Sequence, residues 1–178
     1  MMLKVMFDTN VFNRIRDGIV SVQALAGNVE VFATHIQLDE LQRTKDQGRR
    51  DALAAVFAAV VTKAMPTDSF VLGVSRLGQA RLGGQRVVPT ASAIFGISNY
   101  GQASYTTDDD LYAAIRTRLD SLNGAKSNNL QDALIAETSI KAGHVLVTDD
   151  TDLAVVAKEF GGQCVSVGEL WARCGTAT

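Results

Sequence analysis

The chain has 178 residues, 47% of them hydrophobic and 20% charged, and its formal net charge is −2. This size and composition are typical of one folded soluble domain with a single core. The charge excludes a general attraction to nucleic acid, so a polyanion would have to bind a local basic patch. No apolar run is long enough to cross a bilayer, and the N-terminus leads into a predicted strand with no room for a signal peptide, which predicts a cytoplasmic protein. The two cysteines, Cys164 and Cys174, are too few for a disulfide framework and are expected to be structural thiols.

In chain order, short apolar runs alternate with amphipathic segments, a pattern typical of βαβ units. Strands are predicted over residues 3–7, 29–33, 145–148 and 164–167. Helices are predicted between about residue 10 and Gly18, around Ile36 to Leu41, over 51–63, from Asp108 onward, from Asn128 or Asn129 to Gly143, over 152–160, and around Trp171. The sequence therefore predicts an α/β fold built on a mainly parallel sheet.

The stretch over residues 69–107 interrupts this alternation, because it is rich in glycine and arginine and contains no acidic residue. Arg76, Arg81 and Arg86 recur every five residues. Five residues advance a helix by about 500°, so these arginines would not share one helical face. An extended or looped basic arm is therefore predicted, inserted within a single domain that spans residues 1–178.

Two groups of residues could bind RNA. The arginines of the arm can pair with phosphates, while Tyr100 and Tyr105 can stack on the unpaired bases of a single strand. A further basic cluster follows Glu40 and consists of Arg43, Lys45, Arg49 and Arg50. The alternative for the arm is a solvated loop, and the alternative for the cluster is the solvated face of a helix connection.

Two acidic residues follow predicted strands. Asp8 comes directly after strand 3–7, and Asp150 comes at the end of strand 145–148. The carboxyl ends of parallel strands form the ligand crevice of an open α/β sheet, so both carboxylates are expected at one edge. The alternative for each is a helix-capping role, and one of the acids Asp149, Asp150 and Asp152 is expected to cap the following helix.

Two more acidic residues lie on predicted helices. Asp132 is in the first turn of its helix among apolar neighbours, and Glu40 lies four residues after Ile36, on the same side of its helix. An acid near a helix N-terminus is also favoured by the helix dipole, and Asp39 is the rival of Glu40. Each residue taken singly is more often structural, but the four acids in matching topological positions predict one site.

Four carboxylates in one place repel one another, since two unit charges about 4 Å apart cost roughly 4 kcal/mol at an effective dielectric constant of 20. A divalent cation would neutralise them, and carboxylate oxygens suit Mg²⁺ or Mn²⁺. Such a site predicts metal-assisted hydrolysis of a phosphodiester. This chemistry requires no histidine, and His35 and His144 are expected to be packing or surface residues.

Four segments of the chain, in this order, together resemble the motifs of PIN-domain ribonucleases, a family that includes the VapC toxins of bacterial toxin–antitoxin pairs. They are Phe7-Asp8-Thr9-Asn10, Glu40-Leu41, Asp132-Ala133-Leu134-Ile135-Ala136 and Leu146-Val147-Thr148-Asp149-Asp150-Thr151-Asp152-Leu153. The resemblance covers about residues 3 to 160. It implies a three-layer α/β/α sandwich around the parallel sheet, and an enzyme that cleaves single-stranded RNA with Mg²⁺ or Mn²⁺.

The resemblance also implies roles for individual residues. The metal-binding and catalytic acids would be Asp8, Glu40, Asp132 and Asp150, and Asp152 corresponds to a variable fifth acid. Three further residues would support them: Thr148 as the hydroxyl residue that steadies the site, and Thr9 and Asn10 as residues that orient Asp8.

The resemblance further implies an antitoxin as protein partner, and dimerisation is common in the family. The insertion at 69–107 has no place in the pattern of a compact VapC toxin. The alternative function is a PIN-like module that binds RNA or a protein without cutting.

Overall fold

The computed structural model describes residues 2–25, 27–80, 88–89, 104–106 and 110–175. Its centre is a five-stranded sheet in which every pair of neighbouring strands is parallel. The strand order is β3-β2-β1-β7-β8. The strands are β1 (Leu3–Phe7), β2 (Val29–Ala33), β3 (Lys63–Ala64), β7 (Val145–Val147) and β8 (Cys164–Val165).

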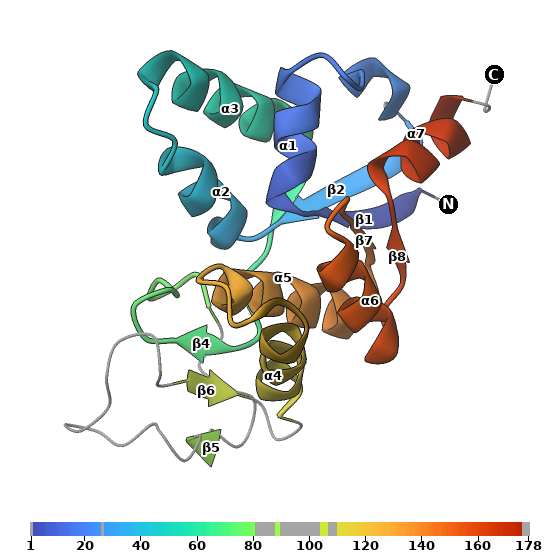
Figure 1. The fold of residues 1–178 in the computed structure, drawn as a ribbon. Coiled ribbons are helices and arrows are strands. Elements are labelled where there is room, and N and C mark those ends of the chain that lie inside the picture. The colour runs from blue at the N-terminus through green and yellow to red at the C-terminus, as the bar shows by residue number, and fades with distance from the viewer. Residues whose placement is uncertain (1, 26, 81–87, 90–103, 107–109, 176–178) are drawn as a thin grey trace.

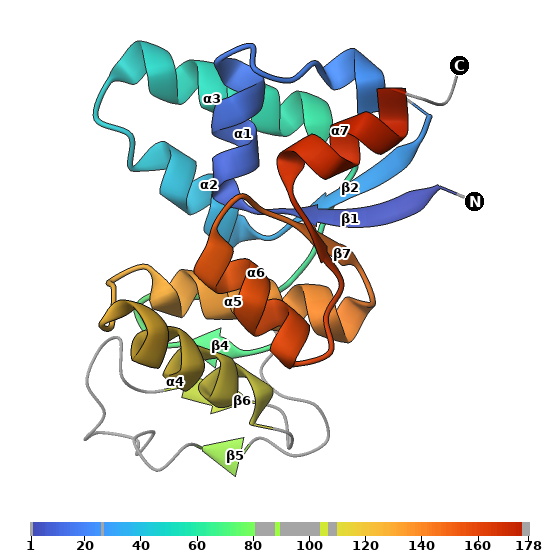
Figure 2. The same cartoon turned by 45° about the vertical axis from the view of Figure 1, so that its right-hand side comes forward.

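Helices cover both faces of this sheet (Figures 1 and 2). One face packs against α1 (Thr9–Arg16), the 3₁₀ turn η1 (Val22–Leu25), α3 (Gln47–Val60) and α7 (Val167–Gly175). The other face packs against α4 (Leu111–Asn123), α5 (Asn129–Ala142) and α6 (Thr151–Glu159). The helix α2 (His35–Gln42) contributes to both layers. The predicted three-layer α/β/α fold is confirmed.

The carboxyl-terminal halves of the central strands are buried on both sides, which explains their apolar sequences, Val5-Met6-Phe7 in β1 and Val31-Phe32-Ala33 in β2. In β1, Val5 and Phe7 pack into one helical layer and Met6 into the other, as the alternation of side chains along a strand requires. All three side chains are inaccessible to solvent. The carboxyl end of β1 is therefore held rigidly at the middle of the sheet.

The boundaries of α3 differ from the predicted helix over 51–63. The helix begins at Gln47, because the Asp46 side chain caps it by accepting a hydrogen bond of 2.6 Å from the backbone N–H of Arg49. It ends at Val60, and residues 63–64 form the edge strand β3 beside β2. An edge strand of two residues leaves too short a pattern for recognition in a sequence.

The caps of α4 and α5 also differ in detail from the predictions. Asp108 lies outside the described residues, and Asp110 precedes α4 with a left-handed backbone (φ 48°). Asn128 occupies the predicted N-cap position of α5, but its side chain makes no capping hydrogen bond to the helix backbone. It donates instead to Asp132 on the first turn of that helix, at 2.8 Å. As predicted, Gly143 ends α5, with a left-handed backbone.

The described parts of the insertion form a second, antiparallel sheet. It consists of β4 (Phe70–Val71), β6 (Ser104–Thr106) and β5 (Val88–Pro89), in that spatial order. The beginning of the insertion is attached to α5, since Val71 joins the core cluster of that layer. The predicted extended arm is thus partly a small sheet, while Arg81, Arg86 and Tyr100 lie outside the described residues.

Within the described residues, no helix is both long enough and apolar enough to span a membrane. Both cysteines are buried free thiols, as expected.

Candidate acidic active site

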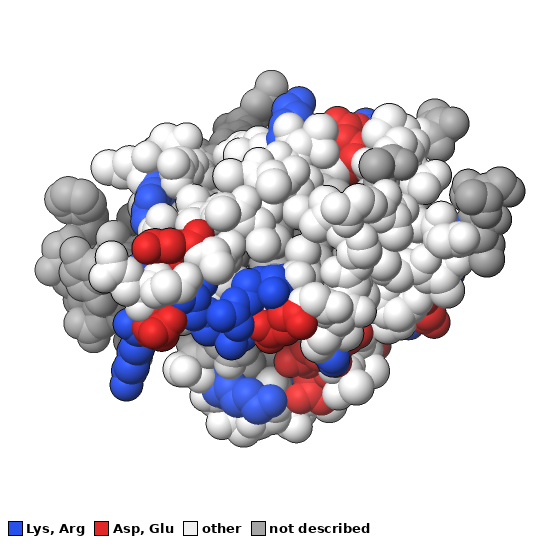
Figure 3. All heavy atoms as spheres, turned by 90° about the horizontal axis from the view of Figure 1, so that it is seen from above, with Lys and Arg blue, Asp and Glu red and all other residues white. Residues whose placement is uncertain are grey.

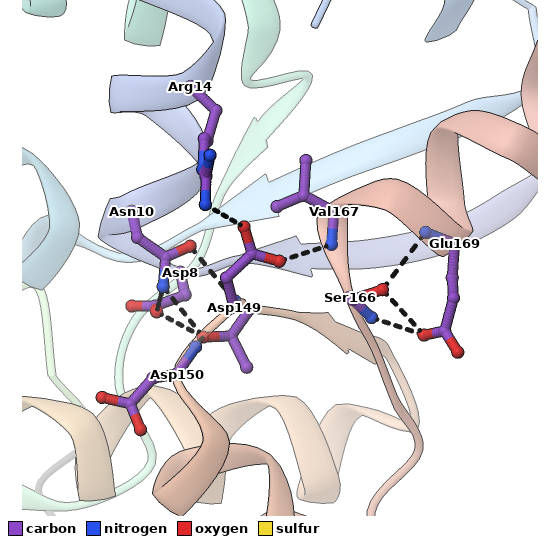
Figure 4. Close-up of polar contacts among 9 residues, drawn as sticks. Asp8, Asn10, Arg14, Asp149, Asp150, Ser166, Val167 and Glu169 are labelled. Atoms are coloured by element: carbon purple, nitrogen blue, oxygen red, sulfur yellow. Dashed lines mark hydrogen bonds and ion pairs between the residues drawn. The ribbon is translucent and has the colours of Figure 1, made fainter. Parts of the chain in front are cut away.

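Asp8 and Asp150 follow two neighbouring strands of the central sheet. Phe7 at the end of β1 is in register with Val147 at the end of β7, and the backbone N–H of Asp8 donates to the carbonyl of Val147 at 3.0 Å. Both side chains therefore start from the same edge of the sheet. In Figure 4 their carboxyl groups point to the same side of the ribbon.

Asp8 accepts several hydrogen bonds and is 5% exposed. One carboxylate oxygen accepts from the backbone N–H of Thr9 at 2.6 Å. The other accepts from the amide of Asn10 at 2.5 Å and from the hydroxyl of Thr148 at 2.6 Å (Figure 4). Burial raises the pKa of Asp8 to about 6, with smaller contributions from the charges of Glu40 and Asp150, although the Thr148 and Thr9 hydrogen bonds act in the opposite direction.

Thr148 connects the two strand ends. Besides donating to Asp8, its hydroxyl oxygen accepts from the amide of Asn10 and from the backbone N–H of Asp150, both at 3.0 Å. The residue is 2% exposed, so rotation of the hydroxyl is restricted by packing as well as by these partners. Thr148 was assigned to the same predicted site as Asp8 and Asn10, and in the structure it forms hydrogen bonds with both.

Glu40 reaches the site from α2. Its carboxylate accepts a short hydrogen bond from the hydroxyl of Thr9, the first residue of α1. Burial raises the pKa of Glu40, while the Thr9 hydroxyl and the charge of Arg43 oppose that increase. The neighbouring candidate Asp39 forms an ion pair with Arg76 instead. Thr9 thus links Glu40 to the segment that carries Asp8.

Asp132 reaches the site from α5 and is 8% exposed. Its pKa is raised to about 8, mainly by burial. The charges of Asp8, Glu40 and Asp150 also raise this pKa, whereas the positive charge of Lys126 lowers it. The four predicted acids therefore act on one another electrostatically, although they come from four separate parts of the chain.

Asp150 and Asp152 lie at the beginning of α6. Asp150 caps this helix, since its side chain accepts from the backbone N–H of Leu153 at 3.0 Å. Asp152 forms an ion pair with Lys126, at 3.7 Å, on the exposed side of the helix. Asp150 therefore combines the capping role and the position at the sheet edge that the sequence left as alternatives.

The donor chemistry of the four acids fits a hard divalent cation, since all their ligand atoms are carboxylate oxygens and burial raises the pKa of three of them. In the part of the chain that the structure describes, none of the four forms an ion pair with a basic side chain. No group of three or more His, Cys, Asp or Glu side chains there is arranged to hold a metal ion as it stands.

Two of the predicted basic residues, Arg49 and Arg76, pair with acidic groups. Arg49 donates to Asn13 at 2.9 Å and pairs with Asp17 at 3.3 Å, and Arg76 pairs with Asp39. Figure 3 shows basic and acidic side chains next to one another on one face, not an unbroken basic surface. Tyr105 is in β6, but its side chain lies outside the described residues, as do Arg81, Arg86 and Tyr100.

Of the two placements expected for the histidines, packing or surface, the structure shows burial for both. His144 is buried, with its ring 4.1 Å from that of Phe32. His35 is buried at the beginning of α2, and burial lowers the pKa of both imidazoles.

Two supporting residues were missed in the sequence. Asn128 donates to Asp132, and the signal for it is the spacing of four residues across the start of a helix. Arg14 pairs with Asp149 at 3.1 Å, and Asp149 also accepts from the backbone N–H of Val167 at 3.0 Å (Figure 4). The Arg14 contact joins residues far apart in the chain, so no local pattern predicts it.

A comparison with solved structures finds similar folds. A chain in the crystal structure of VapBC2 from Rickettsia felis, bound to a DNA fragment from their promoter, has 17% sequence identity and a TM-score of 0.51, covering 92% of this chain and 98% of that chain. VapBC-5 from Mycobacterium tuberculosis has 16% identity and a TM-score of 0.40, covering 92% and 97%. FitAcB from Neisseria gonorrhoeae has 14% identity and a TM-score of 0.36, covering 90% and 95%. The last two scores are too low to bear on the fold.

No family model matches the sequence, and a search of curated proteins finds no match. The match to the Rickettsia felis structure agrees with the resemblance to VapC-type PIN domains that the four motifs predict. At 17% identity this agreement concerns the fold alone, and the roles of the site residues depend on their geometry and chemistry.

Proposed function

We propose that this protein is a ribonuclease that uses Mg²⁺ or Mn²⁺ to hydrolyse phosphodiester bonds of single-stranded RNA. The observation that supports this most is that the charges of Asp8, Glu40, Asp132 and Asp150 act on one another, and that none of the four forms an ion pair with a described basic side chain. A fold gains no stability from buried carboxylates that repel one another, so their gathering is best explained by a cation that they bind.

The side chains around Asp8 would prepare it for this role. Thr148 and Asn10 donate to the same oxygen of Asp8, which orients the carboxylate and favours its charged form. Thr9 would hold Glu40 beside it, and Asn128 would hold Asp132. A bound divalent ion would lower the pKa of a water molecule and offset charge on the scissile phosphate. These hydrogen bonds would keep the carboxylates oriented during the reaction.

The first test is cleavage of a labelled single-stranded RNA with Mg²⁺ or Mn²⁺, with excess chelator, and with Asp8→Asn. We expect chelator to abolish cleavage and Asp8→Asn to lower kcat by roughly a hundredfold or more. The matched control is Asp17→Asn, the same change in an acid at the end of α1 that pairs with Arg16 and Arg49. Circular dichroism would check folding, and full cleavage by Asp8→Asn or in chelator would refute the proposal.

Metal binding has a readout that does not depend on turnover. We expect Mn²⁺ to raise the Tm of the wild-type protein and to raise that of Asp8→Asn much less. A ligand present at a hundred times its Kd stabilises the folded state by about 2.7 kcal/mol. An equal shift in both proteins would place the ion elsewhere.

The physiological role that we propose is that of the toxin in a toxin–antitoxin pair. It is supported by the fold shared with a chain of the Rickettsia felis VapBC2 complex and by the four motifs. A neighbouring gene for a small DNA-binding protein, and co-purification of its product with this protein, would test it. The alternative, a non-cleaving module that binds RNA or a protein, predicts RNA binding that survives Asp8→Asn without any cleavage by the wild type.

A further inference from the structure

A cavity of about 310 Å³ lies beside α2, between that helix, α3 and the segment 64–79. Its apolar lining includes Leu38, Phe57 and Met65. The buried residues Thr34 and His35 and the exposed residue Arg76 also line it, so the cavity extends from the surface into the interior. Small-molecule sites measure roughly 300 to 1,000 Å³, so this one suits a small ligand.

Three contacts hold the walls of the cavity in place. The backbone N–H of Thr67 donates to the carbonyl of Gln79 at 3.2 Å, and the backbone N–H of Arg76 donates to Nε2 of His35 at 3.3 Å. The guanidinium of Arg76 pairs with Asp39 on α2. The end of the segment that closes the cavity is therefore fastened to Thr67 and to α2.

His35 lines this cavity, and one of its ring nitrogens is buried behind the lining. Its Nε2 accepts a hydrogen bond, so in the neutral imidazole the proton is on Nδ1. Nδ1 is buried and makes no hydrogen bond within the described part of the chain. Burial lowers the pKa of His35, against the opposing influence of Asp39 and of the carbonyl groups of Gln79 and Val74, which favours this neutral form. A buried donor without an acceptor is destabilising, and a ligand that carries an acceptor would satisfy it.

The cavity and the acidic site share α2. His35 and Glu40 are five residues apart, about 7.5 Å along the helix axis and about 140° around it. A strand that leads from the acidic site to the cavity would cross the helix at Asp39, where Arg76 neutralises the carboxylate. The guanidinium is half exposed, and its remaining N–H groups are able to contact a phosphate.

We propose that this cavity binds one unpaired base of the RNA strand whose backbone is cleaved at the acidic site. The ring would pack against Leu38, Phe57 and Met65, and a turn of the His35 imidazole would let a carbonyl oxygen or ring nitrogen of the base accept from Nδ1. Arg76 would contact the adjoining phosphate. This inference rests on the proposed nuclease function and identifies the part of the protein that selects nucleotides.

The test is an NMR titration of the full chain labelled at its methionine methyl groups with ¹³C. The chain has four methionines. Met65 lines the cavity, and Met6 is buried in the core as an internal control. Adenosine, cytidine, guanosine and uridine 5′-monophosphates are added without metal. At least one is expected to shift the Met65 resonance saturably while Met6 stays unchanged, and His35→Phe is expected to weaken that binding about three- to tenfold.

Leu38→Trp would fill the cavity and is expected to abolish the Met65 shift. Leu122→Trp, the same change at an exposed leucine of α4, is the matched control and is expected to retain the shift. Ala64→Trp, at an exposed residue that also lines the cavity, replaces Leu38→Trp if that variant does not fold. No Met65 shift with any nucleotide, or an equal shift in the filled variants, would overturn the inference. Because the titration involves no cleavage, a wild type that binds a nucleotide here but cuts no RNA would refute the nuclease function alone.

Discussion

Two groups of acidic residues in this protein have opposite surroundings. Outside the predicted site, several carboxylates pair with arginines: Asp17 with Arg16 and Arg49, Asp39 with Arg76, Asp149 with Arg14, and Glu159 with Arg118. At the carboxyl edge of the central sheet, the carboxylates accept hydrogen bonds from neutral groups and have no arginine or lysine partner among the described residues. The four are Asp8, Glu40, Asp132 and Asp150.

The pKa values follow this division. The hydrogen bonds and charges of arginines lower the pKa of Asp17 and of Glu159, whereas burial raises the pKa of Asp8, Glu40 and Asp132. Within the described part of the chain, the basic residues that form ion pairs all pair with other acids. An ion pair inside the site would compete with a metal ion, so the absence of such pairs among the described residues is consistent with a metal centre.

The adjacent residues Asp149 and Asp150 belong to different groups: Asp149 pairs with an arginine and Asp150 does not. Their amide variants therefore give the strictest test of the difference between the two groups. We expect Asp150→Asn to lower kcat for RNA cleavage by roughly a hundredfold or more, with Tm unchanged because Asn caps a helix as well as Asp does. Asp149→Asn weakens the contacts with Arg14 and Val167 and is expected to lower Tm by a few degrees and to retain most of the activity. Equal activity losses in both variants would contradict the division.

A smaller effect on activity is expected from removing a side chain that donates a hydrogen bond to Asp8. Thr148→Val keeps the shape of the side chain but removes the hydroxyl that lowers the pKa of Asp8. The pH profile of kcat/KM should shift to higher pH, and activity should fall roughly ten- to a hundredfold, the usual cost of losing a residue that orients a metal ligand. An unchanged pH profile in Thr148→Val would show that the hydroxyl only packs.

The stability of the metal-free protein should depend on pH through Asp132. Its folded-state pKa of about 8 lies above the ordinary value of 3.8, so the folded protein binds this proton more tightly than the unfolded chain does. The associated stability is complete below pH about 4 and is lost as the pH rises through about 8. Asp132→Asn should therefore raise the Tm at pH 8 in chelator, by roughly 2–4 °C for each kcal/mol, and leave it nearly unchanged at pH 4. An unaltered Tm at pH 8 would mean that burial and the neighbouring charges do not destabilise the ionised form of Asp132.

The smallest effect concerns the arginines of the insertion. Changing Arg76, Arg81 and Arg86 together to Ala should weaken RNA binding and reduce the slope of log K against log salt by about 0.7 for each lost phosphate contact. Arg118→Ala is the matched control, since Arg118 lies on α4 and pairs with Glu159 at the end of α6. Fluorescence anisotropy at several salt concentrations measures both effects, and an unchanged slope would leave the insertion a solvated segment.

Much of the fold was predictable because its signals are local. The strand over 3–7 and the strand over 29–33 were predicted with their observed bounds, since each is a short, mostly apolar run that ends in three buried residues. The predictions failed where the signal was short or non-local. The two-residue strand β3 has no pattern of its own, and the sheet β4-β6-β5 joins residues more than thirty positions apart.

The sequence by itself determined the kinds of groups available and the order in which they occur. Apolar runs specify the strands, and an acid directly after a strand must lie at that strand's carboxyl end. Only the tertiary structure decided the partners, because packing brings residues 8 and 148 together across the sheet and places Arg14 against Asp149 instead of Asp150. Which carboxylate is neutralised and which stays unpaired depends on distances across the folded chain, and these are set by the packing of the whole core.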